Sequence, residues 1–274
     1  MKHLWSILAF AAVTTCHAAN WYPIIVNGQV MTDYQPPTTV TNWVDPYYVN
    51  LAFLHNMQTT STTYFVDAVG KDDARVMNSI TNVFVGSNVV GRQEYAAYYN
   101  VASVHYLLLT NGTRFPNTGD FTLSAWVWPA VNWTAAVGGA MVYLEDSNGN
   151  QDTHLELRAN LYPWFRSYSG SYQNTTGTIP CSVGTWTHLV VTRSGSTGAM
   201  WINGASNNSG NMQSTLASPR TNACLGMGKQ NASLYSGYSG MIDDVRLYTN
   251  IALDATSISN LFLRTNPTNN IEQR

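Results

Sequence analysis

Four polar residues at alternate positions, Asp152, His154, Glu156 and Arg158, are the closest approach to a catalytic row in this sequence. Alternate residues of a strand point to one face, and two carboxylates facing one cleft can hydrolyse a glycosidic bond. The middle position holds His, however, and we expect Arg158 to pair with Glu156 and keep it ionised, which suits a general acid poorly. The row therefore predicts an exposed polar strand face and no enzyme, with catalysis by Glu156 and Asp152 as the alternative.

No other motif supports catalysis. The sequence contains no GxSxG, no HExxH and no glycine-rich phosphate loop. His188 lies in an apolar run, which favours a hydrogen-bonded structural residue.

Aromatic residues could instead bind a sugar, because sugar faces stack on flat rings that Asn, Asp or Arg surround. The candidates at predicted strand ends and in loops are Trp128, Trp133, Trp164 and Tyr168. Trp126, Trp186 and Trp201 are more simply core residues.

The N-terminus predicts a signal peptide at residues 1–19. A short basic start, Met1-Lys2-His3, precedes an apolar stretch too short for a membrane span. We expect cleavage after Ala18 or Ala19 and a secreted, extracellular protein; a buried N-terminal helix is the alternative. No later segment is apolar enough to span a bilayer.

Cleavage would leave two cysteines, Cys181 and Cys224. Two cysteines in an exported chain predict one disulfide, and two buried free thiols are the alternative. Five Asn-x-Ser/Thr sequons, glycosylation candidates in a eukaryotic secretory path and without meaning in a bacterium, stand at Asn111, Asn132, Asn174, Asn207 and Asn231.

Composition argues against nucleic acid as a partner. Charged residues make up 10% of the 274 residues and the formal net charge is −2, which gives no electrostatic attraction to a polyanion.

Short apolar-alternating runs separated by turn signals predict an all-β antiparallel sandwich. Clear runs cover 121–128, 140–144, 154–158, 186–192, 199–204 and 240–248, and an amphipathic helix is expected at 254–263. Residues 20–47 contain paired prolines and predict an extended arm. The polar residues 265–274 predict a frayed tail.

Four of these runs, in this order, resemble the laminin G-like and pentraxin-like branch of the concanavalin A-like lectin/glucanase superfamily. They are GDFTLSAWV at 119–127, GTWTHLVVT at 184–192, WING at 201–204 and GMIDDVRLY at 240–248. The resemblance implies a two-sheet jelly-roll β-sandwich at residues 48–264, followed by a short C-terminal helix.

The resemblance also implies a structural calcium ion, held by hard oxygen ligands, with Asp243 and Asp244 at the matching positions. We favour Asp244, because Asp243 shares a strand face with Val245 and Leu247. The 67–73 loop is a second possible source of ligands, whereas 146–152 is better explained as a hairpin.

The resulting hypothesis is a secreted, non-catalytic binding or adhesion module that recognises a glycan or an extracellular protein surface. One alternative is a structural subunit of an extracellular or virion-like assembly that self-assembles through the N-terminal arm. The other is a glycoside hydrolase of the same superfamily that uses Glu156.

Overall fold

The computed structural model describes residues 25–26, 29–30, 45–55, 64–65, 74–77, 84–85, 96–100, 105–109, 115–133, 138–146, 151–216, 220–230, 233–235 and 237–265. The predicted signal peptide, most of the arm, residues 266–274 and the 67–73 loop lie outside these residues. The chain divides into a unit at 1–40 and a unit at 41–274. In the first unit, β1 (Ile25–Val26) pairs antiparallel with β2 (Gln29–Val30).

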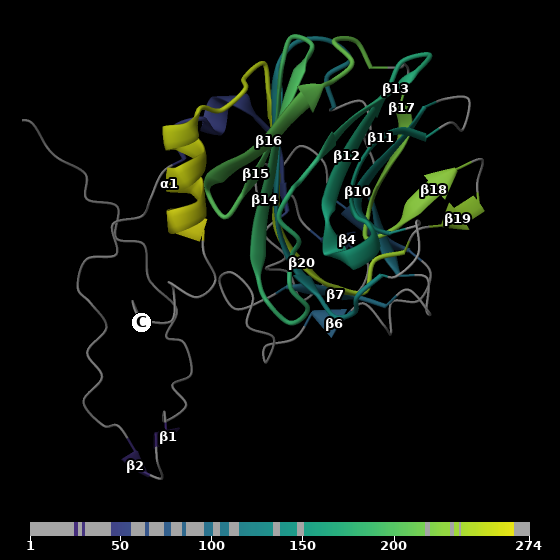
Figure 1. The fold of residues 1–274 in the computed structure, drawn as a ribbon. Helices are drawn as coiled ribbons and strands as arrows, with labels where there is room; N and C mark the ends of the chain where they lie inside the picture. Colours follow the sequence, from purple (N-terminus) through teal and green to yellow (C-terminus); the bar gives the residue numbers. More distant parts are fainter. Residues whose placement is uncertain are drawn as a thin grey trace, which may run out of the picture. The chain divides into compact units, whose positions relative to one another are not determined.

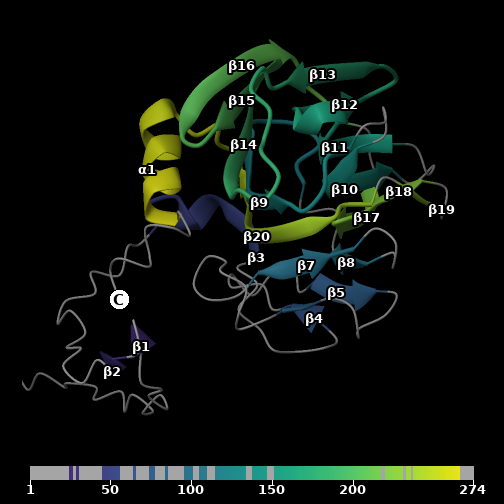
Figure 2. The ribbon, with the colours of Figure 1, turned by 60° about the horizontal axis from the view of Figure 1, so that its bottom comes forward.

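The second unit contains two antiparallel sheets, as the alternating runs predict (Figures 1 and 2). Sheet 1 has the order β13 (Tyr172–Thr176), β12 (Pro163–Tyr168), β11 (Gln151–Leu157), β10 (Gly139–Asp146), β17 (Arg220–Leu225), β8 (Tyr106–Leu109), β5 (Ala74–Met77), β4 (Tyr64–Phe65). Sheet 2 has the order β16 (Ala205–Asn211), β15 (Thr197–Ile202), β14 (Thr187–Ser194), β9 (Phe121–Pro129), β20 (Gly240–Thr249), β7 (Ala97–Tyr99), β6 (Phe84–Val85), and β3 (Leu51–His55) also pairs with β20. The jelly-roll type of β-sandwich is thereby confirmed.

The main core lies between the two sheets and follows the period of two. Leu123, Ala125 and Val127 of β9 are buried in it, as their alternation predicts. The facing sheet contributes Val142 and Leu144 of β10. Other core residues include Leu155, Leu157, Phe165, Leu189, Val191, Ala223 and Leu225.

The helix α1 (Ala255–Thr265) covers the outer face of sheet 2, on the side of β14 to β16 away from sheet 1 (Figure 1). Its Ile258 and Leu261 form a second apolar cluster with Val190 of β14 and Tyr248 of β20. The predicted helix at 254–263 is confirmed to within two residues at its end. Within the described residues, no helix is long and apolar enough to cross a bilayer.

Trp126 shows how α1 is attached to sheet 2. Its indole Nε1 donates a hydrogen bond of 2.8 Å to Thr265 Oγ1, and its ring stacks on Phe262 with centroids 5.6 Å apart. His188, on the neighbouring strand, shares a 2.8 Å hydrogen bond between its Nε2 and Ser124 Oγ. The structural role predicted for His188 is therefore confirmed.

The predicted disulfide is wrong, because Cys181 and Cys224 are both buried and form no disulfide in the structure. Cys181 packs in the core between the sheets, whereas Cys224 packs with Tyr106 and Met227 on the outer face of sheet 1. Alternation explains this separation, because Cys224 lies between two core residues of β17 and must point the other way. The alternative of two buried thiols is the correct one.

Candidate functional site

The outer face of sheet 1 gathers aromatic and charged residues from neighbouring strands. Leu155 and Leu157 of β11 and Phe165 of β12 point into the core, so the residues between them point outward. We define the aromatic–arginine face as Tyr143, His154, Glu156, Arg158, Trp164, Arg166, Tyr168 and Tyr172.

Antiparallel register places these residues side by side. His154 lies opposite Tyr143 on β10 and opposite Arg166 on β12. One row further, Glu156 lies opposite Trp164. Directly opposite residues are the closest side-chain neighbours in a sheet, so the strand pairing itself assembles the face.

Trp164 is packed between arginines and does not form an open platform. The guanidinium carbon of Arg158 lies 3.4 Å from its ring centroid and that of Arg166 lies 4.2 Å from it. Cation–π attraction favours these contacts, and they leave Trp164 only 6% exposed. The guanidinium groups therefore cover the ring that was predicted to stack on a sugar, which argues against an open platform at Trp164.

The proposed catalytic row is also largely buried. His154 and Glu156 are 3% and 4% exposed, so the prediction of an exposed polar face is wrong for both. The Arg158 Nε donates a hydrogen bond to Glu156 Oε1, which confirms the expected ion pair. Asp152 belongs to β11, but its side chain lies outside the described part of the structure. The distance between the carboxyl groups of Asp152 and Glu156 therefore plays no part in the argument.

The environment of His154 keeps its imidazole neutral. Its ring stacks on Tyr143 with centroids 5.5 Å apart and tilts against Trp164 at 5.2 Å. Burial lowers the pKa of His154 well below its usual value, and the positive charges of Arg166 and Arg158 lower it further.

The exposed end of the face lies at the β12–β13 hairpin. The rings of Tyr168 and Tyr172 lie 4.7 Å apart, and the Arg166 guanidinium lies 4.3 Å from the Tyr172 ring. Arg166 Nε also donates a hydrogen bond of 3.4 Å to Asn174 Oδ1. Tyr172 is 43% exposed, so this end combines aromatic surface with guanidinium and amide groups.

Sequence reasoning found Tyr168 but missed Tyr172 and Arg166. The available signal was the alternation of Trp164, Arg166 and Tyr168, followed by the turn Ser169-Gly170-Ser171. Such a turn predicts a hairpin, and the hairpin sets Tyr172 opposite Tyr168.

Trp128 and Trp133 do not join this face. Trp128 is on β9 of sheet 2, half-buried and paired with Met241. Trp133 stacks on Tyr238 with centroids 5.4 Å apart and packs against the main core. The four predicted platform residues therefore lie in three separate places, and only Trp164 and Tyr168 share a surface.

The predicted calcium ligands lie on β20, where Asp244 contacts a guanidinium group. Arg246 Nε lies 3.0 and 2.9 Å from the two Asp244 carboxylate oxygens, and both residues are buried. Arg246 Nη1 also donates to Asp45 Oδ2 at 3.0 Å, and that oxygen accepts a 2.5 Å hydrogen bond from the Tyr248 hydroxyl. The backbone bends here, since Asp244 has a φ of 48° and the β20–β9 register shifts between Asp243 and Arg246.

The arginine occupies the place where a cation would stand beside Asp244. Burial lowers the pKa of Arg246, but the charges of Asp244 and Tyr248 and the hydrogen bonds to both side chains together raise it by more, so the guanidinium stays charged. Among the described residues, no three His, Cys, Asp or Glu side chains form a group that could hold a metal. Calcium therefore stays a prediction, and the 67–73 loop lies outside the described residues.

The sequons differ in exposure. Asn132 and Asn174 are exposed, and Asn207 is half-buried with its Oδ1 accepting a hydrogen bond from the Thr178 amide. Asn111 and Asn231 lie outside the described residues. Glycosylation at any of the five stays a prediction.

Two solved structures similar to this chain are toxin binding domains. The binding domain of botulinum neurotoxin serotype D/C VPI 5993 matches with a TM-score of 0.61 and 14% identity, covering 80% of this chain and 53% of that one. The botulinum neurotoxin DC binding domain in complex with rat synaptotagmin II matches with a TM-score of 0.61 and 12% identity, covering 80% and 52%. The chain thus spans about half the length of these toxin domains.

A third similar structure is domain 4 of AbnA, a GH43 extracellular arabinanase from Geobacillus stearothermophilus, in complex with arabinotriose. It has a TM-score of 0.57 and 18% identity, and the match covers 77% of this chain and 98% of that one. At these identities, the likeness shows the fold alone. No curated protein sequence matches the chain.

A family model described as the concanavalin A-like lectin/glucanases superfamily, of the laminin G type, matches residues 102–259. This range is more than half of the chain. It includes the four motifs that carried the resemblance, the aromatic–arginine face and most of both sheets. The chain therefore belongs to the concanavalin A-like lectin/glucanases superfamily.

Proposed function

We propose that this protein is a secreted, non-catalytic binding module that recognises a glycan through the exposed end of the aromatic–arginine face. The observation that carries the proposal is the group formed by Arg166, Tyr168 and Tyr172. Tyrosine rings offer apolar surface to a sugar face, while guanidinium and amide groups can bond its hydroxyls.

The buried part of the face supports this role. Arg158 and Arg166 both stack on Trp164, and Arg158 is further held by Glu156. Side chains held by several contacts lose less conformational entropy on binding. In this proposal Trp164 positions Arg166 and does not itself contact the sugar.

The similar structures support a binding role without indicating a particular ligand. Domain 4 of AbnA is in complex with arabinotriose, and the toxin domains are named as binding domains. The complex with synaptotagmin II favours a protein surface as the second candidate ligand.

The test is a glycan array probed with the folded domain, with and without added calcium. We expect a restricted set of glycans to bind, and we expect Arg166→Ala and Tyr172→Ala to bind that set more weakly. Binding to no glycan, together with binding to an extracellular matrix protein, would replace the glycan by a protein ligand.

The non-catalytic part has its own measurement. The glycans that bind are incubated with the protein, and newly formed reducing ends are assayed. We expect none, because Glu156 is only 4% exposed and its Oε1 already accepts a hydrogen bond from Arg158 Nε. Release that disappears in Glu156→Gln would instead establish a hydrolase.

Secretion is part of the proposal and rests on residues 1–19. Expression of the full chain in a secreting host, followed by N-terminal sequencing, tests it. We expect a mature chain in the culture medium that starts after Ala18 or Ala19. A secreted chain that still begins at Met1, or a chain found only inside the cell, would contradict secretion through this signal peptide.

A further inference from the structure

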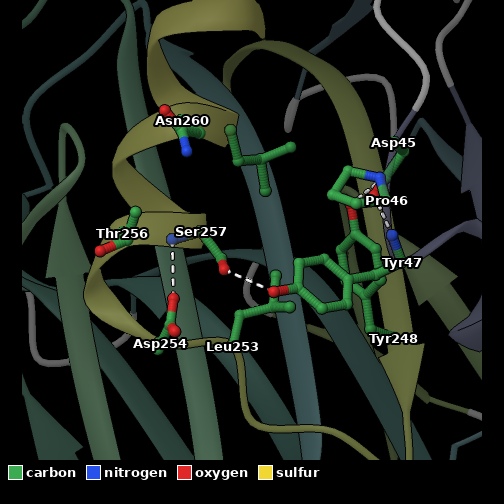
Figure 3. Close-up of a pocket in the computed structure, with 10 residues that line it drawn as sticks. Asp45, Pro46, Tyr47, Tyr248, Leu253, Asp254, Thr256, Ser257 and Asn260 are labelled. Carbon is green, nitrogen blue, oxygen red and sulfur yellow. Dashed lines mark hydrogen bonds between the residues drawn. The ribbon is translucent and has the colours of Figure 1, made fainter.

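A cavity lies on the outer side of sheet 2, away from the aromatic–arginine face. It is lined by residues 45–47, by Tyr248 of β20 and by the start of α1 (Figure 3). It is a cavity of about 300 Å³. This volume is at the small end of the range for ligand sites, about 300 to 1,000 Å³.

The wall formed by residues 45–47 is fixed in place. Asp45 is held to β20 by Tyr248 and Arg246, through the bonds described above. The Asp45 Oδ1 also accepts a 2.9 Å hydrogen bond from the Tyr47 backbone amide. Because these anchors are buried or half-buried, Tyr47 stands at a defined distance from the helix.

The opposite wall comes from one side of α1. Thr256 and Ser257 stand four and three residues before Asn260, so the side chain of each neighbours that of Asn260 on the helix. The Tyr47 and Ser257 hydroxyls lie 2.7 Å apart across the gap, as the dashed line in Figure 3 shows. Leu253 and Leu261 add apolar lining.

The lining selects the class of ligand. Among the described residues that line the cavity there is no Lys or Arg, and two are aspartates, Asp45 and Asp254, so an anion is disfavoured. An aromatic ring beside hydroxyl and amide groups fits a molecule with one apolar face and several hydroxyls. Either hydroxyl of the half-buried Tyr47–Ser257 pair can donate or accept, so a ligand hydroxyl can replace their bond without leaving either hydroxyl unpaired.

We infer that this cavity binds one neutral monosaccharide unit, such as the terminal residue of a glycan chain. This inference goes beyond the proposed function, because the cavity belongs to α1 and sheet 2 and uses no residue of the aromatic–arginine face. A chain with two sites on different faces could link two glycans or bind one glycan at two points.

Saturation-transfer NMR with the folded domain tests the inference, with glucose, galactose, mannose and N-acetylglucosamine as separate probes. We expect at least one of them to bind with a Kd of about millimolar, as befits so small a ligand. Asn260→Trp fills the cavity and should weaken that binding by at least about tenfold. Leu263→Trp places the same side chain on an exposed part of the same helix, outside the cavity, and should leave it unchanged.

Three results would overturn the inference. None of the four sugars binds, or the binding persists in a folded Asn260→Trp variant, or it is lost in Tyr172→Ala, which would assign it to the first site. If Asn260→Trp fails to fold, amide shift mapping on the wild type decides the matter. Shifts should concentrate at 45–47 and 253–261, and shifts confined to 164–174 would contradict it.

Discussion

At the scale of single residues, His154 couples stability to pH. The unfolded side chain has a pKa of about 6.5, and burial among rings and guanidinium groups lowers the pKa in the folded state. The unfolded chain therefore binds more protons below about pH 6.5, so stability is complete above that pH and falls as the pH drops towards the folded pKa.

His154→Gln should remove this dependence. We expect the free energy of unfolding of the wild type to fall by up to about 1.4 kcal/mol per pH unit below about pH 6.5, and that of the variant to fall less steeply. Urea titrations between about pH 7 and pH 5 measure both slopes. Equal slopes would mean that His154 takes up its proton without unfolding.

Arg246 is a buried charged residue with a large expected effect on stability. Arg246→Met leaves the carboxylates of Asp244 and Asp45 buried without their cation. Breaking a buried ion pair in this way costs about 3 to 5 kcal/mol, measured as the loss in urea-unfolding free energy. Arg75→Met, at an exposed arginine on β5, is the control and should change stability by less than about 0.5 kcal/mol.

The two thiols can be detected directly. Burial raises the pKa of Cys181 to about 12, and Cys224 is fully buried, so neither should react with iodoacetamide in the native domain. In urea without any reductant, mass spectrometry should show both residues alkylated. Alkylation that requires a reductant would restore the disulfide that the sequence predicts.

The residues of the site show where sequence reasoning ends. The ion pair of Glu156 with Arg158 followed from their alternation. The covering of the Trp164 ring could not be predicted in this way. Arg166 reaches the ring from two residues further along β12, and Arg158 reaches it from the residue that follows β11. Exposure depends on such packing between chain segments, which periodicity does not record.

At the scale of elements, strands with a continuous apolar face could be predicted, and strands without one were missed. The runs of β9, β14, β15 and β20 alternate cleanly and carried the family resemblance. β13 is YQNTT, with one buried residue, so it shows no apolar alternation. The bend at Asp244 was also missed, since a positive φ at an aspartate has no reliable sequence signal.

The packing of α1 on sheet 2 gives the prediction at this scale. Leu261 is 2% exposed and lies in the cluster between the helix and the sheet. Leu261→Ala should cost about 2 to 5 kcal/mol of unfolding free energy, the usual loss for a buried leucine. Leu263→Ala, at a half-exposed position of the same helix, is the matched control, and an equal loss in both variants would show that α1 does not pack as described.

At the scale of the whole molecule, the sandwich has different coverings on its two outer faces. The helix α1 covers part of sheet 2, while β18 (Gly228–Gln230) approaches β10 and β17 on the outer face of sheet 1. The hairpin of β12 and β13 ends with Tyr172 open to solvent. The sequence predicted the sandwich from its pattern, but which outer surface stays open depends on these additions.

The central claim is that the exposed end of the aromatic–arginine face binds a glycan, and isothermal titration with one array-selected glycan tests it most directly. Tyr172→Ala removes the exposed ring, whereas Tyr48→Ala removes a ring that is 51% exposed on the segment before β3. Losing an aromatic contact of about 0.5 to 1.5 kcal/mol should weaken binding by about twofold to tenfold in Tyr172→Ala. Tyr48→Ala should keep the wild-type affinity, and unchanged affinity in Tyr172→Ala would contradict glycan binding at this end of the face.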